Sequence, residues 1–123
     1  GLIVTTPQEN AVGDALRGAK MFEDVGVPLL GIVENMSYFV IPGTNRREYV
    51  FGRGGGQRLA DELGVPLLAE VPLATQVQEF GEAGTPVVLK EPDSPAGVAL
   101  RGMAERVETE VAARTVRLPI VAG

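Results

Sequence analysis

The residues best suited to bind a ligand stand at the ends of short apolar segments. Glu34 and Asn35 close one such segment, and Val71, Pro72 and Leu73 close another. The side-chain amide of Asn35 offers one acceptor and two donors, which match the paired donor and acceptor on the edge of an adenine base. A turn that contains Pro72 offers backbone groups and an apolar wall for a purine ring. These residues predict a purine pocket, and the alternative is an asparagine that only forms a turn or a cap.

Composition excludes several kinds of chemistry. The 123 residues include no cysteine and no histidine, so the chain has no disulfide, no thiolate nucleophile, no Cys-ligated zinc and no histidine acid–base pair. No spaced cluster of aspartates indicates a Mg²⁺ or Ca²⁺ site. We therefore expect no catalytic and no metal-ligating residues. A chain without cysteine fits a cytoplasmic location, which we expect.

Charge and hydropathy give no reason to expect nucleic acid or a membrane as a partner. The net charge is −5, and the eleven Lys and Arg residues do not form one block, so long-range attraction to polyanions is weak. No apolar run approaches the ~18 residues that span a bilayer. We expect neither partner.

The glycine-rich segment 52–56 precedes a helix predicted at 57–63. A glycine-rich turn at a helix N-terminus can bind an anion. This segment lacks the Gly-Lys-Ser/Thr ending of a P-loop and follows a hairpin instead of a parallel strand. We interpret it as a flexible hinge, with a phosphate site as the alternative.

The elements that position these residues alternate between strand and helix. Thr6 as N-cap, Pro7 and Glu9 predict the start of a helix with a capping box, and this helix is expected to reach Val25. Strand–helix–strand units have parallel strands, whose carboxyl ends meet at one edge of the sheet. The sequence therefore predicts an α/β fold, one domain over residues 1–123, with part of a doubly wound, mostly parallel sheet. The apolar, β-branched segments that predict its strands are 2–5, 29–34 and 67–71.

An inserted β-hairpin is predicted between the second strand and the glycine-rich segment. Its strand-like runs are 38–41 and 47–51, around a turn at 42–45. The hairpin holds both tyrosines and two of the four phenylalanines. A flap that packs on its own domain and a surface that binds a partner are both open interpretations.

The C-terminal part is predicted to be helical with extended connections. Thr75 is expected to cap a helix over 75–82, and Ser94 with Pro95 to open the last helix. Segments 86–89 and 114–123 are expected to be extended. The chain begins at an apolar strand, which predicts the C-terminal part of a larger protein; a small processed protein is the alternative.

Four motifs carry a family resemblance: TTPQ at 5–8, GIVENMS at 31–37, FGRGGG at 51–56 and EPDSP at 91–95. Together they closely resemble the C-terminal half of the Mrp family of P-loop ATPases. These are the ApbC-type iron–sulfur cluster carrier proteins, related to the MinD and ParA ATPases. The resemblance covers nearly the whole chain. It implies that Asn35 and the backbone of Val71, Pro72 and Leu73 form the adenine side of an ATP site.

The resemblance also implies what the rest of the protein does. The family's phosphate-binding loop, Mg²⁺ site and switch residues precede the matched part, so the parent protein would be an ATPase that binds Mg-ATP and this chain alone would be inactive. The parent is expected to form a homodimer and to act in iron–sulfur cluster assembly or transfer with client or scaffold proteins.

Two departures separate this sequence from the family pattern. Ile41 and Thr44 stand where the family carries a Cys-x-x-Cys pair around Pro42. Neither residue supplies the thiolate that an iron–sulfur cluster needs, so this chain is not expected to ligate a cluster. Ala74 stands where the family tends to have an aspartate. The alternative function is therefore a nucleotide-dependent scaffold of the MinD/ParA type without cluster binding.

Overall fold

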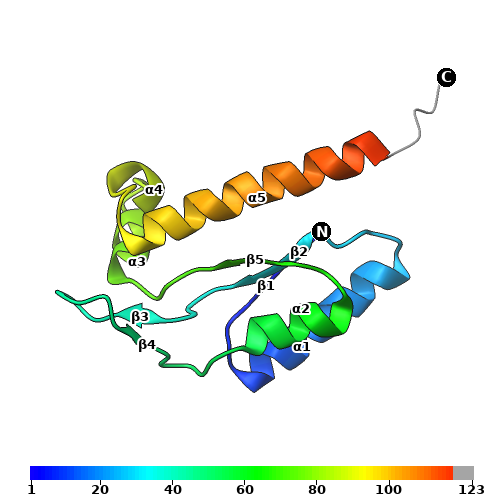
Figure 1. Ribbon diagram of the computed structural model, residues 1–123, viewed down its shortest axis with the longest axis horizontal. Helices are drawn as coiled ribbons and strands as arrows, with labels where there is room; N and C mark the ends of the chain where they lie inside the picture. The colour runs from blue at the N-terminus through cyan, green and yellow to red at the C-terminus, as the bar shows by residue number, and fades with distance from the viewer. Residues whose placement is uncertain (118–123) are drawn as a thin grey trace.

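The computed structural model describes residues 1–117, which form a parallel sheet with helices on both faces (Figure 1). Helices α1 and α2 cover one face, and the long helix α5 crosses the other. This arrangement confirms the predicted α/β class with an inserted hairpin. The elements are β1 (Leu2–Thr5), α1 (Glu9–Asp24), β2 (Gly31–Glu34), β3 (Phe39–Val40), β4 (Arg47–Glu48), α2 (Gly55–Leu63), β5 (Leu67–Glu70), α3 (Thr75–Glu82), α4 (Val87–Lys90) and α5 (Pro95–Arg117).

The main sheet has the strand order β1-β2-β5, and both neighbouring pairs are parallel. Parallel pairing follows from the crossovers through α1 and α2, since a tight turn can join only antiparallel strands. All four residues of the central strand β2 are buried, as expected for a strand with helices on both faces. The register brings Thr5, Glu34 and Glu70 side by side at the carboxyl ends of the three strands.

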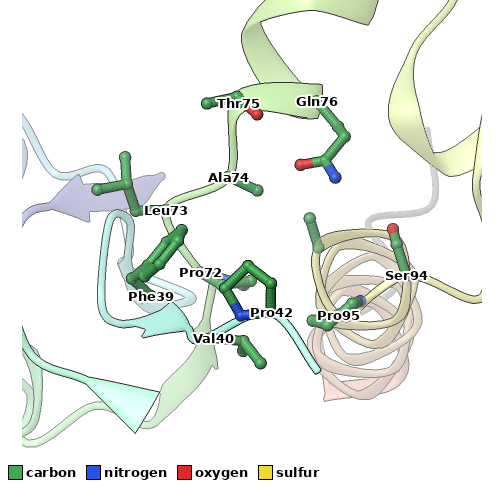
Figure 2. A pocket seen from close by; sticks show the side chains of 11 residues that line it. Phe39, Val40, Pro42, Pro72, Leu73, Ala74, Thr75, Gln76, Ser94 and Pro95 are labelled. Carbon is green, nitrogen blue, oxygen red and sulfur yellow. The ribbon is translucent and has the colours of Figure 1, made fainter. Parts of the chain in front are cut away.

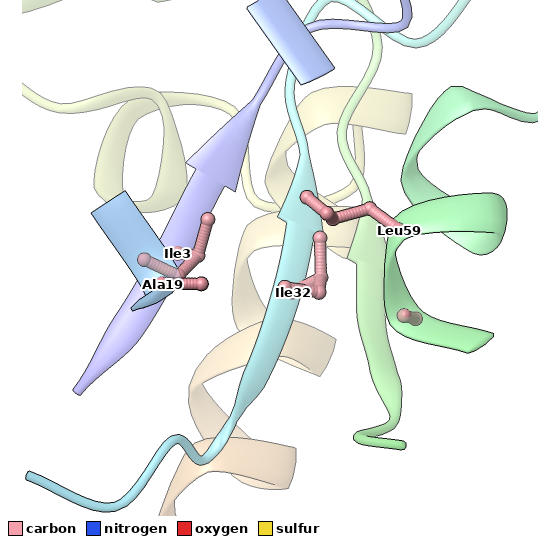
Figure 3. Packing of buried hydrophobic residues seen from close by; sticks show 5 residues of the cluster. Ile3, Ala19, Ile32 and Leu59 are labelled. Carbon is pink, nitrogen blue, oxygen red and sulfur yellow. The ribbon is translucent and has the colours of Figure 1, made fainter. Parts of the chain in front are cut away.

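Each face of the sheet has its own apolar core because successive side chains of a strand point to opposite faces. On the α1/α2 face, the cluster consists of Ile3, Ala19, Ile32, Leu59 and Ala60 (Figure 3). The apolar side chains of α1 that pack against this cluster are Val12, Ala15, Leu16 and Phe22. On the other face, Val33, Leu68 and Val71 pack against the apolar side of α5, whose contributing residues are Ala99, Leu100, Met103 and Val107.

Two of the predicted helix caps are wrong and one is confirmed. Gln8, not Thr6, is the N-cap of α1, because Gln8 itself has an extended backbone (ψ 142°) and the helix begins at Glu9. Ala74, not Thr75, is the N-cap of α3 for the same reason, with ψ at 135°. At the start of α5 the Ser94 hydroxyl accepts the N–H of Gly97 at 3.1 Å, as predicted.

Segments 87–89 and 114–117 are helical, so the prediction of extended structure is wrong for these residues, while Pro86 itself has an extended ψ of 146°. The φ of Pro86, −54°, suits the entrance of a helix, and its carbonyl accepts the N–H of Lys90 at 3.0 Å. In the last turns of α5, the Arg114 guanidinium donates to the Leu29 carbonyl at 2.8 Å, which holds the helix end against the sheet. The remaining part of the predicted tail, 118–123, lies outside the described residues. Among residues 1–117, no helix is both long and apolar enough to cross a bilayer.

Candidate functional site

Backbone hydrogen bonds join the three strand ends into one edge. The N–H of Asn35 donates to the carbonyl of Thr5 at 2.7 Å, and the N–H of Val71 donates to the carbonyl of Glu34 at 2.8 Å. The connection continues beyond the strands, where Ser37 donates to the Val71 carbonyl at 2.9 Å. The convergence predicted for parallel strands is therefore present.

Asn35 lies in an open hollow of about 440 Å³ between β1 and the first turns of α1. The hollow is lined by Thr5, Thr6, Asp14 and neighbouring apolar residues. Within residues 1–117 the side-chain amide of Asn35 forms no hydrogen bond, although its backbone N–H does. An asparagine that capped a helix or closed a turn would use that amide. The donors and the acceptor of the amide are therefore available to a ligand.

The turn at 71–73 lies against a different hollow. Pro72 and Leu73 line an apolar cavity of about 350 Å³ between the hairpin, the start of α3 and the start of α5, while the Val71 side chain packs into the core (Figure 2). The N–H of Leu73 donates to the Tyr38 carbonyl at 2.7 Å. The predicted site residues thus share one edge but line two hollows, and the purine pocket stays a prediction.

Glu34 is a buried carboxylate whose role the sequence reasoning missed. Its side chain is only 3% exposed. One carboxylate oxygen accepts the N–H of Gly56 at 2.8 Å, and the other accepts the hydroxyl of Ser37, which is fully buried. Because Gly56 lies in the first turn of α2, Glu34 meets the positive end of that helix. Glu34 therefore ties the end of β2 both to α2 and to the turn that follows Asn35.

The last two residues of the glycine-rich segment, Gly55 and Gly56, are buried and closely packed, whereas the interpretation of 52–56 as a flexible hinge stays a prediction. Helix α2 already begins at Gly55, after Gly54 with a left-handed φ of 84°. A Cβ at Gly55 would come closer than 3.0 Å to the carbonyl oxygen of Pro7, and a Cβ at Gly56 would lie 2.9 Å from the Glu34 Cβ. The anion at this helix N-terminus is a carboxylate of the chain itself. A buried acid upstream of a glycine-rich helix start is the signal that could have indicated it.

The hairpin is shorter than predicted and carries stacked side chains. Only Phe39–Val40 and Arg47–Glu48 pair as strands. The guanidinium of Arg47 lies 4.0 Å from the centre of the Tyr38 ring, and that of Arg53 lies 4.5 Å from the Tyr49 ring. Two short strands leave few backbone hydrogen bonds, so the stacked rings help to hold the hairpin against the domain.

At the hairpin tip, Thr44 folds back on Ile41. The Thr44 hydroxyl donates to the Ile41 carbonyl at 2.8 Å, and the Thr44 N–H donates to the same oxygen at 3.1 Å. The tip thus presents an aliphatic and a hydroxyl side chain at the positions of the family's cysteine pair. These donors do not fit an iron–sulfur cluster.

The buried phenol of Tyr38 predicts a loss of stability at alkaline pH. Burial raises the pKa of Tyr38 above its ordinary value of 10.0, although the Arg47 guanidinium acts in the opposite direction. The unfolded chain then loses this proton before the folded chain does. The stability linked to Tyr38 is fully present below about pH 10 and is lost as pH rises through the folded pKa.

We expect Tyr38→Phe to reduce the fall of the urea unfolding midpoint between about pH 9 and pH 11. Tyr49→Phe is the control, and equal slopes for wild type and Tyr38→Phe would contradict the assignment.

The comparisons with known sequences point to one family. A family model described as ParA, NUBPL iron-transfer P-loop NTPase, matches residues 1–108. The iron–sulfur cluster carrier protein of Synechocystis is 48% identical over 111 residues, which make up 89% of this chain and 31% of that protein. The chain spans about a third of the length of the curated relatives it matches.

Solved structures agree on the fold. The cell division ATPase MinD of Pyrococcus furiosus superposes with a TM-score of 0.67 at 26% identity, over 88% of this chain and 41% of that one. The nucleotide-binding protein of Archaeoglobus fulgidus, solved in complex with ADP, gives a TM-score of 0.62 at 31% identity, over 76% of this chain and 37% of that one. With the parallel sheet, the covering helices and the match over residues 1–108, these likenesses show that the chain belongs to the ParA/NUBPL family of iron-transfer P-loop NTPases.

Proposed function

We propose that the chain is the adenine-binding part of an ATP-binding protein that acts in iron–sulfur cluster transfer. The observation that carries the proposal is the amide of Asn35, which has no hydrogen-bond partner within residues 1–117 and lies at the carboxyl edge of a parallel sheet. Ligands of doubly wound sheets bind at that edge. The role in cluster transfer rests on the relatives, which are named iron–sulfur cluster carrier proteins.

The chemistry of Asn35 suits adenine. Its amide oxygen can accept from the exocyclic amino group of the base, while its NH₂ group donates to a ring nitrogen. Asn35 and the turn that follows β5 line separate hollows, but neighbouring strands of a sheet lie only about 4.8 Å apart, so in this proposal one base reaches from Asn35 to that turn. There Pro72 offers an apolar wall, and the backbone of Val71 and Leu73 borders the site. The phosphates and Mg²⁺ are bound by the remainder of the ATPase domain in this proposal, and the chain itself binds the base.

Replacing Asn35 tests this assignment. In the full-length protein that contains the chain, we expect Asn35→Ala to weaken ADP binding about tenfold, since a bidentate contact to adenine is worth about 1–3 kcal/mol. Isothermal titration calorimetry measures the change. Asn45→Ala makes the same chemical change at the exposed hairpin tip and should leave the affinity unaltered. Unchanged binding by Asn35→Ala would exclude this residue as the base contact.

A second candidate function is a nucleotide-dependent scaffold that does not ligate a cluster. The observation that favours it is the absence of thiolate ligands at Ile41 and Thr44. Iron and sulfide analysis of the full-length protein after anaerobic reconstitution distinguishes the two functions. A stoichiometric cluster would support the carrier function and would require ligands outside this chain. Homodimerisation and a cytoplasmic location belong to the same proposal and rest on the family resemblance.

A further inference from the structure

Positive charge is concentrated on and beside the hairpin. Four of the eleven Lys and Arg residues lie within residues 46–58, where Glu48 is the only acidic residue, although the chain as a whole carries a net charge of −5. All four side chains are exposed. We call this set the arginine surface. Its members are Arg46, Arg47, Arg53 and Arg58.

No member of the arginine surface forms an ion pair with a side chain of residues 1–114, where the only ion pair joins Arg17 to Asp14 on α1. In the same part of the chain, the one side-chain hydrogen bond of the surface runs from Arg58 to the carbonyl of Arg53 at 3.2 Å. The four exposed guanidinium groups therefore form a patch of positive charge on an otherwise acidic molecule.

Two of these guanidinium groups are held in place before any partner binds. Arg47 stacks on Tyr38 and Arg53 stacks on Tyr49, at 4.0 and 4.5 Å from the ring centres. The two rings lie 6.3 Å apart and are inclined by 57°. Stacking occupies the faces of the guanidinium groups and leaves their N–H edges to bind a carboxylate in a bidentate fork. Held side chains lose less entropy on binding than mobile ones.

A small cavity lies between the stacked arginines. It measures about 230 Å³, and its walls include Arg47, Tyr49, Arg53 and Gln57. Two carboxylates also border the cavity, those of Glu34 and Glu70. Neither forms an ion pair with Arg47 or Arg53, and the Glu34 carboxylate accepts hydrogen bonds from Gly56 and Ser37. The negative charges of Glu34 and Glu70 oppose the binding of a free anion, which has no other contact to offset the repulsion.

We propose that the arginine surface binds an acidic segment of a partner protein, with one carboxylate placed between Arg47 and Arg53. A protein segment gains further contacts along the hairpin, where Val50 is 55% exposed, and these contacts offset the repulsion by Glu34 and Glu70. A long polyanion such as nucleic acid, or an anionic membrane, would also meet the acidic remainder of the chain. The proposal does not depend on nucleotide binding.

Charge reversal tests the proposal. The probe is a fluorescein-labelled peptide of about eight glutamates, and fluorescence anisotropy with the chain measures its dissociation constant. We expect the double variant Arg47→Glu/Arg53→Glu to bind at least about tenfold more weakly. The control Lys20→Glu/Arg101→Glu makes the same change of net charge on exposed parts of α1 and α5 and should change the affinity by less than about twofold. Equal losses for the two double variants would overturn the proposal.

A conservative variant separates stacking and bidentate binding from charge alone. Arg47→Lys/Arg53→Lys keeps both positive charges, so it retains the electrostatic attraction but loses the bidentate hydrogen bonds of the guanidinium groups. We expect its dissociation constant for the peptide to rise about threefold to fivefold. Circular dichroism confirms that each variant is folded. The binding of the chain to vesicles that contain phosphatidylserine and to a labelled oligonucleotide is measured at the same salt concentration. Tighter binding of either than of the acidic peptide would overturn the proposal.

Discussion

Replacing Glu34 with alanine is expected to lower the free energy of unfolding by about 3 kcal/mol. The substitution leaves the buried N–H of Gly56 without the carboxylate that accepts from it, and leaves the buried hydroxyl of Ser37 with only a longer hydrogen bond to Glu70, at 3.4 Å. It also removes the negative charge at the positive end of α2. Urea unfolding of the chain, followed by circular dichroism, measures the loss.

Two comparison variants make this result specific. Glu62→Ala removes an exposed carboxylate from α2 and should change the stability by no more than about 0.5 kcal/mol. Glu34→Gln keeps an acceptor for Gly56 but turns an NH₂ group toward Ser37, so its stability should lie between those of wild type and Glu34→Ala. If Glu34→Ala were as stable as Glu62→Ala, the carboxylate would not hold β2, α2 and the turn together.

Gly55→Ala is expected to destabilise the chain by about 2–3 kcal/mol, although alanine is the better helix former. The added methyl group would meet the carbonyl oxygen of Pro7, which belongs to the backbone and cannot rotate away. Either α2 or the turn before α1 must then shift. The midpoint of urea unfolding measures the effect.

Gly13→Ala is the matched control, because Gly13 lies within a helix and a methyl group there would meet nothing within 4 Å. This variant should stabilise the chain by about 0.5–1 kcal/mol, through helix propensity alone. Opposite signs for the two variants would show that Gly55 is needed for close packing. A stabilising Gly55→Ala would instead support the interpretation of the segment as a flexible hinge.

Local patterns predicted most of the elements, because their signals lie within a few residues. The strands predicted at 2–5 and 67–71 and the Ser94–Pro95 start of α5 depend on short-range sequence patterns or capping. The convergence of the strand ends followed from the parallel order alone. Predictions of this kind do not require knowledge of tertiary contacts.

The errors arise where distant contacts decide the local structure. Glu34 binds Gly56 across 22 positions of sequence, so nothing near Gly56 indicates that this glycine packs against a buried carboxylate. Thr6 has the sequence of an N-cap, but the helix begins only at Glu9 after an extended Gln8, so Thr6 cannot act as one. Pro86 suits both an extended segment and the entrance of a helix. The separation of Asn35 from the 71–73 turn into two hollows depends on where the hairpin and α5 pack.

The structure of the full-length protein in complex with ADP tests the proposed base site most directly. The proposal predicts that the adenine amino group lies within hydrogen-bond distance of the Asn35 amide oxygen, with the ring against the turn formed by Val71, Pro72 and Leu73. An adenine ring bound elsewhere, with the Asn35 amide facing solvent, would contradict the assignment of this chain as the adenine-binding part of the ATPase.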